Sequence, residues 1–189
     1  VRRYYDSLNS LLKGNSPEEE AQKIELLMNQ ANVTIEDRHV VAAALKRAEE
    51  THTPAAALEL DDGRIITGKT TNLLGASAAL LLNVIKELAG LKHELHIISP
   101  ESIEPIQKLK VDYLKSKNPR LHTDEVLIAL SASAATNPDA RLALQQLSKL
   151  NGCQAHTSVM LSDVDIRTFK RLGVQLTCEA VYETGYNYH

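Results

Sequence analysis

The sequence predicts an α/β protein, in which a helical segment is followed by a mixed sheet of about five strands. Up to residue 52, apolar residues recur at three- and four-residue spacing, as on one face of a helix. At Pro54 the pattern changes to short runs that flank an Asp-Gly turn, which is typical of a β-hairpin. Strand and helix patterns then alternate, which favours parallel strands. We therefore expect a helical segment over residues 1–52 and an α/β subdomain over residues 53–189.

The helical segment divides into three predicted helices. Gly14 ends the first, Ser16 and Pro17 open the second, and Thr34 caps the third. Each carries one apolar stripe that we expect to be buried. The stripes are Tyr4, Tyr5, Leu8, Leu11 and Leu12; Ile24, Leu27, Met28 and Ala31; and Val41, Ala44, Leu45 and Ala48.

The α/β part is expected to begin with a hairpin of residues 55–60 and 64–67, which places one antiparallel strand at an edge. An almost wholly apolar helix of residues 77–88 follows, then strands 93–98, 152–161 and 174–181 separated by helices. In those helices Ser99-Pro100 opens one with Ile103, Ile106, Leu109 and Tyr113 facing inward, and Thr123, Asn137 and Ser162 cap the others. This order resembles the cytidine-deaminase-like topology. The tail, 182–189, is expected to pack on a neighbour or to fray.

Composition excludes several classes of protein. Apolar residues make up 43% of the chain, but no run approaches the roughly 20 residues that span a bilayer. The net charge is −3, with 21 basic and 24 acidic residues interspersed, so we expect no nucleic-acid partner and no membrane. Two cysteines, Cys153 and Cys178, are too few for a disulfide framework, which indicates a cytoplasmic protein.

A phosphate-loop pattern, G-x-x-x-x-G-K-[ST], is matched by residues 63–70. A working loop needs its first glycine after a strand, with the next residues wrapped around the phosphates. Here Gly63 belongs to the hairpin turn and residues 64–67 alternate as a strand does, which would hold the two glycines about 15 Å apart. We interpret the match as accidental, although Gly68 to Asn72 still joins a strand to a helix, where backbone N–H groups can hold an anion.

Metal chemistry finds little support. The deaminase topology would require a His/Cys-x-Glu and a Pro-Cys-x-x-Cys at two helix starts, and the chain has Thr71-Asn72-Leu73-Leu74 and Ser99-Pro100-Glu101-Ser102 there, so a zinc deaminase is rejected. His122, Asp124 and His156 are alternative ligands of a metal-dependent hydrolase, but three or four must converge. Their use as ordinary capping and strand residues is favoured, and no metal site is assigned.

Position alone suggests where a ligand could bind, because ligands collect at the carboxyl ends of parallel strands in open α/β sheets. No cofactor is indicated and no catalytic residue can be assigned. The candidate ligand-binding residues are Lys69, Thr70, Thr71 and Asn72 after the hairpin, and Ser99, Glu101 and Ser102 after residues 93–98.

Several long stretches match a known family. They are residues 24–31, 36–44, 67–71, 74–79, 116–126 and 152–157. Together they resemble the C-terminal part of the bacterial domain-of-unknown-function family 1846. The resemblance implies a protein more than twice this size, whose N-terminal portion carries its own phosphate-loop-like segment, and a C-terminal subdomain of deaminase-like topology preceded by helices. No activity is assigned to the family, so no catalytic residues are transferred.

Three hypotheses follow. The first is a scaffold or homo-oligomerisation domain whose partner is the N-terminal remainder of the same protein, since no acid–base, nucleophile or metal set converges. A well-formed pocket lined by ionisable groups with shifted pKa values would weigh against it. The second is a phosphate- or nucleotide-binding module using Lys69, Thr70 and Thr71. The third is the metal-dependent hydrolase. Whether the chain is an enzyme is left open.

Overall fold

A four-stranded mixed sheet forms the centre of the computed structural model, which describes residues 1–183. The order is β2 (Ile65–Lys69), β1 (Ala55–Glu59), β3 (Gln154–Thr157), β4 (Gln175–Cys178). β1 is antiparallel to both neighbours, and β3 and β4 are parallel. Residues 184–189, which belong to the predicted tail, lie outside the described residues.

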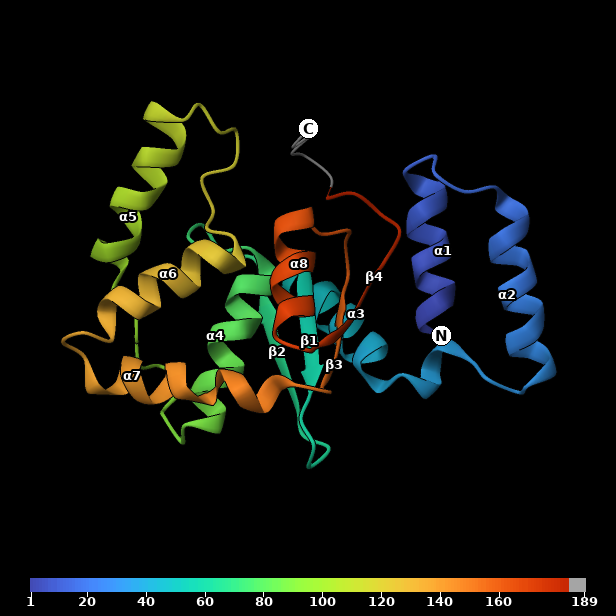
Figure 1. The fold of residues 1–189 in the computed structure, drawn as a ribbon, viewed down its shortest axis with the longest axis horizontal. Coiled ribbons are helices and arrows are strands. Elements are labelled where there is room, and N and C mark those ends of the chain that lie inside the picture. The colour runs from blue at the N-terminus through green and yellow to red at the C-terminus, as the bar shows by residue number, and fades with distance from the viewer. Residues whose placement is uncertain (184–189) are drawn as a thin grey trace.

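Helices cover both faces of the sheet. Ala57 faces α3 (His39–Thr51), while Ala56 and Leu58 face α4 (Ala76–Leu88) and the main apolar core. The helices α6 (Thr123–Ser133), α7 (Pro138–Leu144) and α8 (Asp163–Arg171) also contribute to this core. Figure 1 shows α1 (Arg2–Leu12) and α2 (Glu18–Gln30) at one end of the long axis, α5 (Pro100–Lys108), α6 and α7 at the other, and the sheet between them.

The hairpin is confirmed, and with it the strand interpretation of the phosphate-loop pattern. Gly63 occupies the turn with φ +82°, and Ile65 to Lys69 pair with β1 along their whole length. Gly68 has a packing role instead. A Cβ there would overlap the backbone of Leu80 and lie 2.8 Å from the carbonyl carbon of Ala79. The glycine therefore allows α4 to lie directly on β2.

The strand predicted over residues 93–98 is wrong, so the sheet has four strands rather than five and the deaminase-like topology is not confirmed. Only Ile97 and Ile98 of this segment are buried. The side chain of Lys86, on α4, donates hydrogen bonds to the carbonyl oxygens of His93 (2.6 Å) and Leu95 (3.4 Å). These carbonyls are thus bonded to a side chain rather than to a neighbouring strand.

The helical segment has three α-helices, as predicted, but two details differ. Thr34 caps the 3₁₀ turn η1 (Ile35–Asp37), closed by a hydrogen bond from its N–H to Asp37, and α3 begins only at His39. Four residues expected in buried stripes are exposed: Leu12, Leu27, Ala31 and Leu45. α2 packs mainly on α1, whereas α3 lies on three strands of the sheet. A helix packed on one neighbour leaves part of its apolar surface in water.

The helix that begins at Pro100 continues beyond Lys108 as one π-helical stretch, η2 (Leu109–Tyr113). Ile103 faces inward as predicted, but Leu109 is exposed and Tyr113 is 72% exposed. The change of helical pitch rotates these residues away from the predicted face. The caps Asn137 and Ser162 are confirmed, and α7 continues into η3 (Gln145–Leu150). The predicted caps Thr123 and Ser16 are wrong: the capping box with Glu125 makes His122 the N-cap of α6, and Pro17 is the N-cap of α2. Within the described part of the chain, we find no helix with the length and apolar character needed to cross a membrane.

Candidate functional site

A cavity of about 520 Å³ lies where three helices begin. Gly75 to Ser77 at the start of α4, His122 at the start of α6, and Ser162 at the start of α8 all line it. Residues 115–118, 120–121, 159–161 and 182–183 also line it, together with Pro54, Thr70 and Asp165. Since the N-terminus of each helix carries partial positive charge, the dipoles favour an anion at this point.

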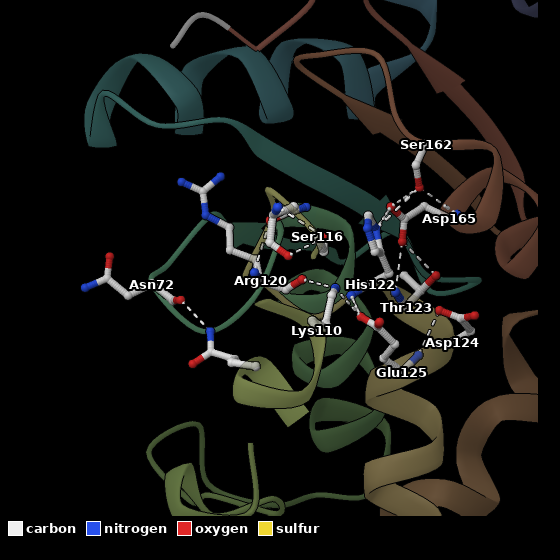
Figure 2. Close-up of polar contacts among 12 residues, drawn as sticks. Asn72, Lys110, Ser116, Arg120, His122, Thr123, Asp124, Glu125, Ser162 and Asp165 are labelled. Atoms are coloured by element: carbon white, nitrogen blue, oxygen red, sulfur yellow. Dashed lines mark hydrogen bonds and ion pairs between the residues drawn. The ribbon is translucent and has the colours of Figure 1, made fainter. Parts of the chain in front are cut away.

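One internal carboxylate already occupies the starts of α6 and α8. Asp165 Oδ1 accepts hydrogen bonds from the N–H and the hydroxyl of Thr123, both at 2.9 Å, and its Oδ2 accepts from the Ser162 hydroxyl at 2.8 Å. His122 Nδ1 donates to the same Oδ2 at 3.0 Å. Figure 2 shows these three side chains converging on Asp165. The cluster joins α6 to α8.

The Asp165–His122 pair is tuned by its surroundings. Burial opposes ionisation of Asp165, but the hydrogen bonds and the charge of His122 outweigh it, so the pKa of Asp165 lies below its ordinary value. The hydrogen bond to Asp165 raises the pKa of His122, although burial opposes it. His122 Nε2 has no hydrogen-bond partner among residues 1–183. This half-exposed ring can therefore present an N–H, and in acid a full positive charge, to the cavity.

A second carboxylate closes the first turn of α6. Glu125 Oε2 accepts a hydrogen bond from the N–H of His122 at 2.7 Å, and it forms an ion pair with the buried Lys110 at 2.6 Å. Lys110 also donates to the carbonyl oxygen of Arg120 at 2.6 Å (Figure 2). Because Lys110 holds the backbone of residue 120, it fixes the loop that carries the basic side chains of the cavity.

The start of α4 differs from those of α6 and α8. Its cap is Gly75, no side chain accepts from its first N–H groups, and its first turn holds no acidic residue. Ser77 is only 2% exposed and lines the cavity, yet its hydroxyl makes no hydrogen bond to any residue that the structure describes. The N–H groups and the hydroxyl of this first turn are thus available to a bound molecule.

Basic side chains stand at the mouth. Lys115 and Lys117 are exposed, and Lys117 makes no ion pair within residues 1–183. Arg120 pairs with Glu183 at 2.8 Å. With His122, these cations outnumber the two carboxylates that line the cavity, Asp165 and Glu183. The excess positive charge again favours an anion.

The geometry does not suit a serine nucleophile. Ser162 lies 3.4 Å from His122 Nδ1, which is the nitrogen that Asp165 already holds. In a nucleophilic triad the serine and the carboxylate bind opposite nitrogens of the imidazole. Ser162 therefore serves as a cap.

Comparison with known proteins identifies the family. The family model described as "Domain of unknown function DUF1846, C-terminal" matches residues 36–188. The chain belongs to the DUF1846 family. It is 53% identical over 182 residues to the UPF0371 protein cu0538 of Corynebacterium urealyticum, covering 96% of this chain and 37% of that protein. It is 46% identical over 183 residues to the UPF0371 protein str1377 of Streptococcus thermophilus, covering 97% and 37%. These names assign no activity.

The DUF1846 chain thus spans 37% of the length of these curated relatives. The resemblance predicted from the sequence is confirmed, and so is the bacterial and uncharacterised nature of the family. Function must therefore be argued from the site itself.

In this DUF1846 domain the predicted ligand-binding residues are not brought together. Thr70 lines the cavity described above, while Lys69 and Thr71 line a second cavity. Asn72 accepts a hydrogen bond from Gln107 through its carbonyl oxygen, at 2.9 Å. The hydroxyls of Ser99 and Ser102 bond to each other at 3.1 Å, and Glu101 lies in the first turn of α5, where hydrogen bonds from its own N–H and from Ser99 lower its pKa. These last four residues line neither cavity.

The proposed metal ligands also stay apart. His122 binds Asp165 rather than Asp124, whose side chain accepts from the N–H of Glu125. His156 is buried on the other side of the sheet, held by Thr177 (2.8 Å) and Glu179 (3.1 Å). No group of three or more histidine, cysteine or acidic residues suited to a metal ion occurs within the described part of the chain.

Sequence reasoning missed Asp165 and Ser77. The signal for Asp165 was the cap of α8, since an acidic residue three positions after Ser162 is the pattern of a capping box. The signal for Ser77 was the run Gly75-Ala76-Ser77, a helix start of small residues without an acid.

Proposed function

We propose that the cavity at the starts of α4, α6 and α8 binds a small molecule through a phosphate group. The observation that carries this proposal is the first turn of α4, which is buried, uncapped by any side chain and equipped with an unpartnered serine hydroxyl. A tetrahedral oxyanion accepts several hydrogen bonds at once and bears the charge that the helix dipole favours.

The charges around the cavity support an anion rather than a neutral ligand. The oxygens of the Asp165 carboxylate are already occupied by four hydrogen bonds, including that of His122, and Glu183 is paired with Arg120. Lys117 and His122 Nε2 are left to meet the ligand. A volume of about 520 Å³ exceeds that of one phosphate ion, so the phosphate is expected to be one end of a larger organic molecule.

This proposal modifies the phosphate-binding hypothesis drawn from the sequence. The anion is placed against α4 and His122, and Thr70 alone of the predicted residues lines the cavity. A cavity lined by His122 and Asp165, both with shifted pKa values, also weighs against a purely structural role. We also propose that the remaining length of the protein completes the site, that the protein self-associates and that it is cytoplasmic. The deaminase-like order of elements is proposed as a shared topology only, without zinc chemistry.

Calorimetric titration with inorganic phosphate, pyrophosphate and adenosine monophosphate tests the proposal. We expect saturable binding of at least one of them, weakened about tenfold by Lys117→Glu, since the variant replaces a cation beside the ligand by an anion. Lys46→Glu, an exposed change on α3 away from the cavity, is the matched control and should leave the affinity unchanged. Absence of binding at millimolar ligand, or equal weakening by both variants, would refute the proposal.

A further inference from the structure

A second cavity, of about 340 Å³, lies along the free edge of the sheet. It is bounded by the edge strand β2, by α4, and by residues 95–98 and 100. Its walls are largely apolar, formed by Leu73, Leu74, Ala79, Leu82, Ile98 and Ile103. A volume of this size suits a small organic molecule.

The ionisable side chains that line this cavity are all basic. They are Arg47, Lys69, Lys86, His93 and His96, and no aspartate or glutamate belongs to the lining. Lys69 is exposed and has no ion-pair partner within residues 1–183. The Nε of Arg47 is buried and likewise lacks a hydrogen-bond partner in the described part of the chain. Arg47 Nη1 also lies 3.7 Å from Glu50, so Lys69 supplies the unpaired positive charge at the rim. An apolar space with such a cation at its rim is complementary to an amphipathic anion.

Lys86 strengthens the positive character from within. Lys86 is 9% exposed, and its ammonium group donates hydrogen bonds to two carbonyl oxygens rather than to a carboxylate. Burial lowers the pKa of Lys86, and the nearby charge of Glu94 only partly opposes this. A buried cation without a carboxylate partner is stabilised when an anion enters its cavity.

The strand edge adds backbone donors. Arg64 and Thr70, at the two ends of β2, form backbone hydrogen bonds with Leu60 and Pro54, at the two ends of β1. Because hydrogen-bonded positions alternate along an antiparallel pair, the odd-numbered residues of β2 direct their N–H and C=O groups away from β1. Thr67 and Lys69 are two of these. The carbonyl of Thr67 is covered by the side-chain amide of Asn83 at 3.0 Å, which leaves the edge N–H groups as donors to a ligand.

We propose that this second cavity binds a small monocarboxylate with an aliphatic body. The carboxylate lies at the edge of β2, beside Lys69 and Arg47, and the aliphatic part lies against Leu82, Ile98 and Ile103. This site is separate from the phosphate cavity, because the segment after β2 divides them: Thr70 lines the first cavity and Thr71 the second. Phosphate itself suits the second cavity poorly, since much of the lining offers it no hydrogen bonds.

Calorimetric titration with butanoate, hexanoate, octanoate and neutral 1-octanol tests this assignment. We expect the affinity to rise about fourfold for each CH₂ added along the carboxylate series, which is the effect of about 0.8 kcal/mol per buried CH₂. 1-Octanol should bind at least tenfold more weakly than octanoate, since it lacks the charge that Lys69 and Arg47 bind. No saturable binding of octanoate, or equal binding of octanol, overturns the proposal.

Two surface variants make the test specific. Lys69→Glu, at the exposed rim, should weaken octanoate binding about tenfold while the circular dichroism spectrum is unchanged. Lys46→Glu makes the same charge change outside the cavity and should leave octanoate binding as it was. Excess inorganic phosphate should not displace octanoate. Equal effects of the two variants, or displacement by phosphate, would overturn the assignment to this separate site.

Discussion

The starts of α4 and α6 line the same cavity, but only the start of α6 has carboxylates of the protein bonded to its N–H groups. Asp165 provides α6 with a carboxylate that bonds to the first N–H and hydroxyl of the helix, and Glu125 adds a second. The first turn of α4 is just as deeply buried, yet it has neither a capping side chain nor an acid. The difference separates a helix start whose N–H groups are bonded within the protein from one that we propose binds a ligand.

This comparison explains why the two helix starts should respond differently to mutation. Removing the internal carboxylate from α6 costs stability, because buried donors and His122 lose their acceptor. Adding a carboxylate to α4 should instead cost ligand affinity, because it takes the place of the bound anion.

The largest effect is expected from Asp165→Ala, which removes the acceptor of Thr123, His122 and Ser162 together. We expect the free energy of unfolding to fall by about 3 kcal/mol, as for the loss of one partner from a buried pair. Urea denaturation measures this. Asp163→Ala removes an exposed carboxylate of the same helix turn and should cost about 0.5 kcal/mol or less. Equal costs would mean that burial and partners of Asp165 contribute nothing.

Ser77→Asp gives α4 the internal anion that α6 already has. We expect phosphate affinity to fall by more than tenfold in calorimetric titration, because the new carboxylate competes for the same N–H groups and repels the ligand. Ser131→Asp, at an exposed position on α6, adds the same charge away from the cavity and is the matched control. Unchanged phosphate affinity in the Ser77 variant would show that α4 does not bind the anion.

The pH dependence of stability tests the role of Asp165 and His122 at the start of α6. Asp165 has a lowered pKa when folded, so its contribution is present above its ordinary pKa of 3.8 and is lost as the pH falls through the folded value. His122 has a raised pKa, so its contribution is full below 6.5 and is lost as the pH rises through the folded value. The pair should therefore stabilise the fold most between these two ordinary values.

His122→Gln tests this window. The variant should abolish the loss of stability that accompanies a rise in pH above 6.5, measured by urea denaturation at successive pH values, because glutamine does not titrate. His39→Gln changes an exposed histidine and should retain that loss. If both variants keep the wild-type profile, the pair with Asp165 does not control the pH dependence.

Local sequence signals predicted most of the elements, whereas the assembly of the site depended on contacts between segments that are distant in the sequence. Ser162 and Asn137 cap the helices that they were predicted to cap, because a cap needs only the next three residues. The strand over residues 93–98 failed because a strand needs a partner, and Lys86 of another element bonds to its carbonyls instead. Asp165 is 42 residues from Thr123, a separation at which spacing carries no information.

The predicted ligand-binding residues show the same limit. Lys69, Thr70 and Thr71 are adjacent in sequence, and we expected them to share one ligand. Successive residues of an extended segment point to opposite sides. Thr70 therefore lines one cavity, and Lys69 and Thr71 line the other. Proximity in sequence indicated the correct region of the fold but assigned these residues to one site instead of two.

The smallest expected effect comes from Gly75→Ser, which gives α4 the kind of cap that Ser162 gives α8. A Cβ at residue 75 would meet only the carbonyl oxygen of Leu121, at 3.9 Å, and the backbone there is extended, so the side chain fits. We expect the free energy of unfolding to rise by a few tenths of a kcal/mol, the usual difference between serine and glycine at this position. Phosphate should bind more weakly at the same time, by about twofold, because the new hydroxyl occupies one N–H. Ser162→Ala, the reverse change on α8, should lower stability by about 1 kcal/mol, since the cap is lost. A rise in both stability and phosphate affinity in the Gly75 variant would separate capping from binding and refute the shared use of these N–H groups.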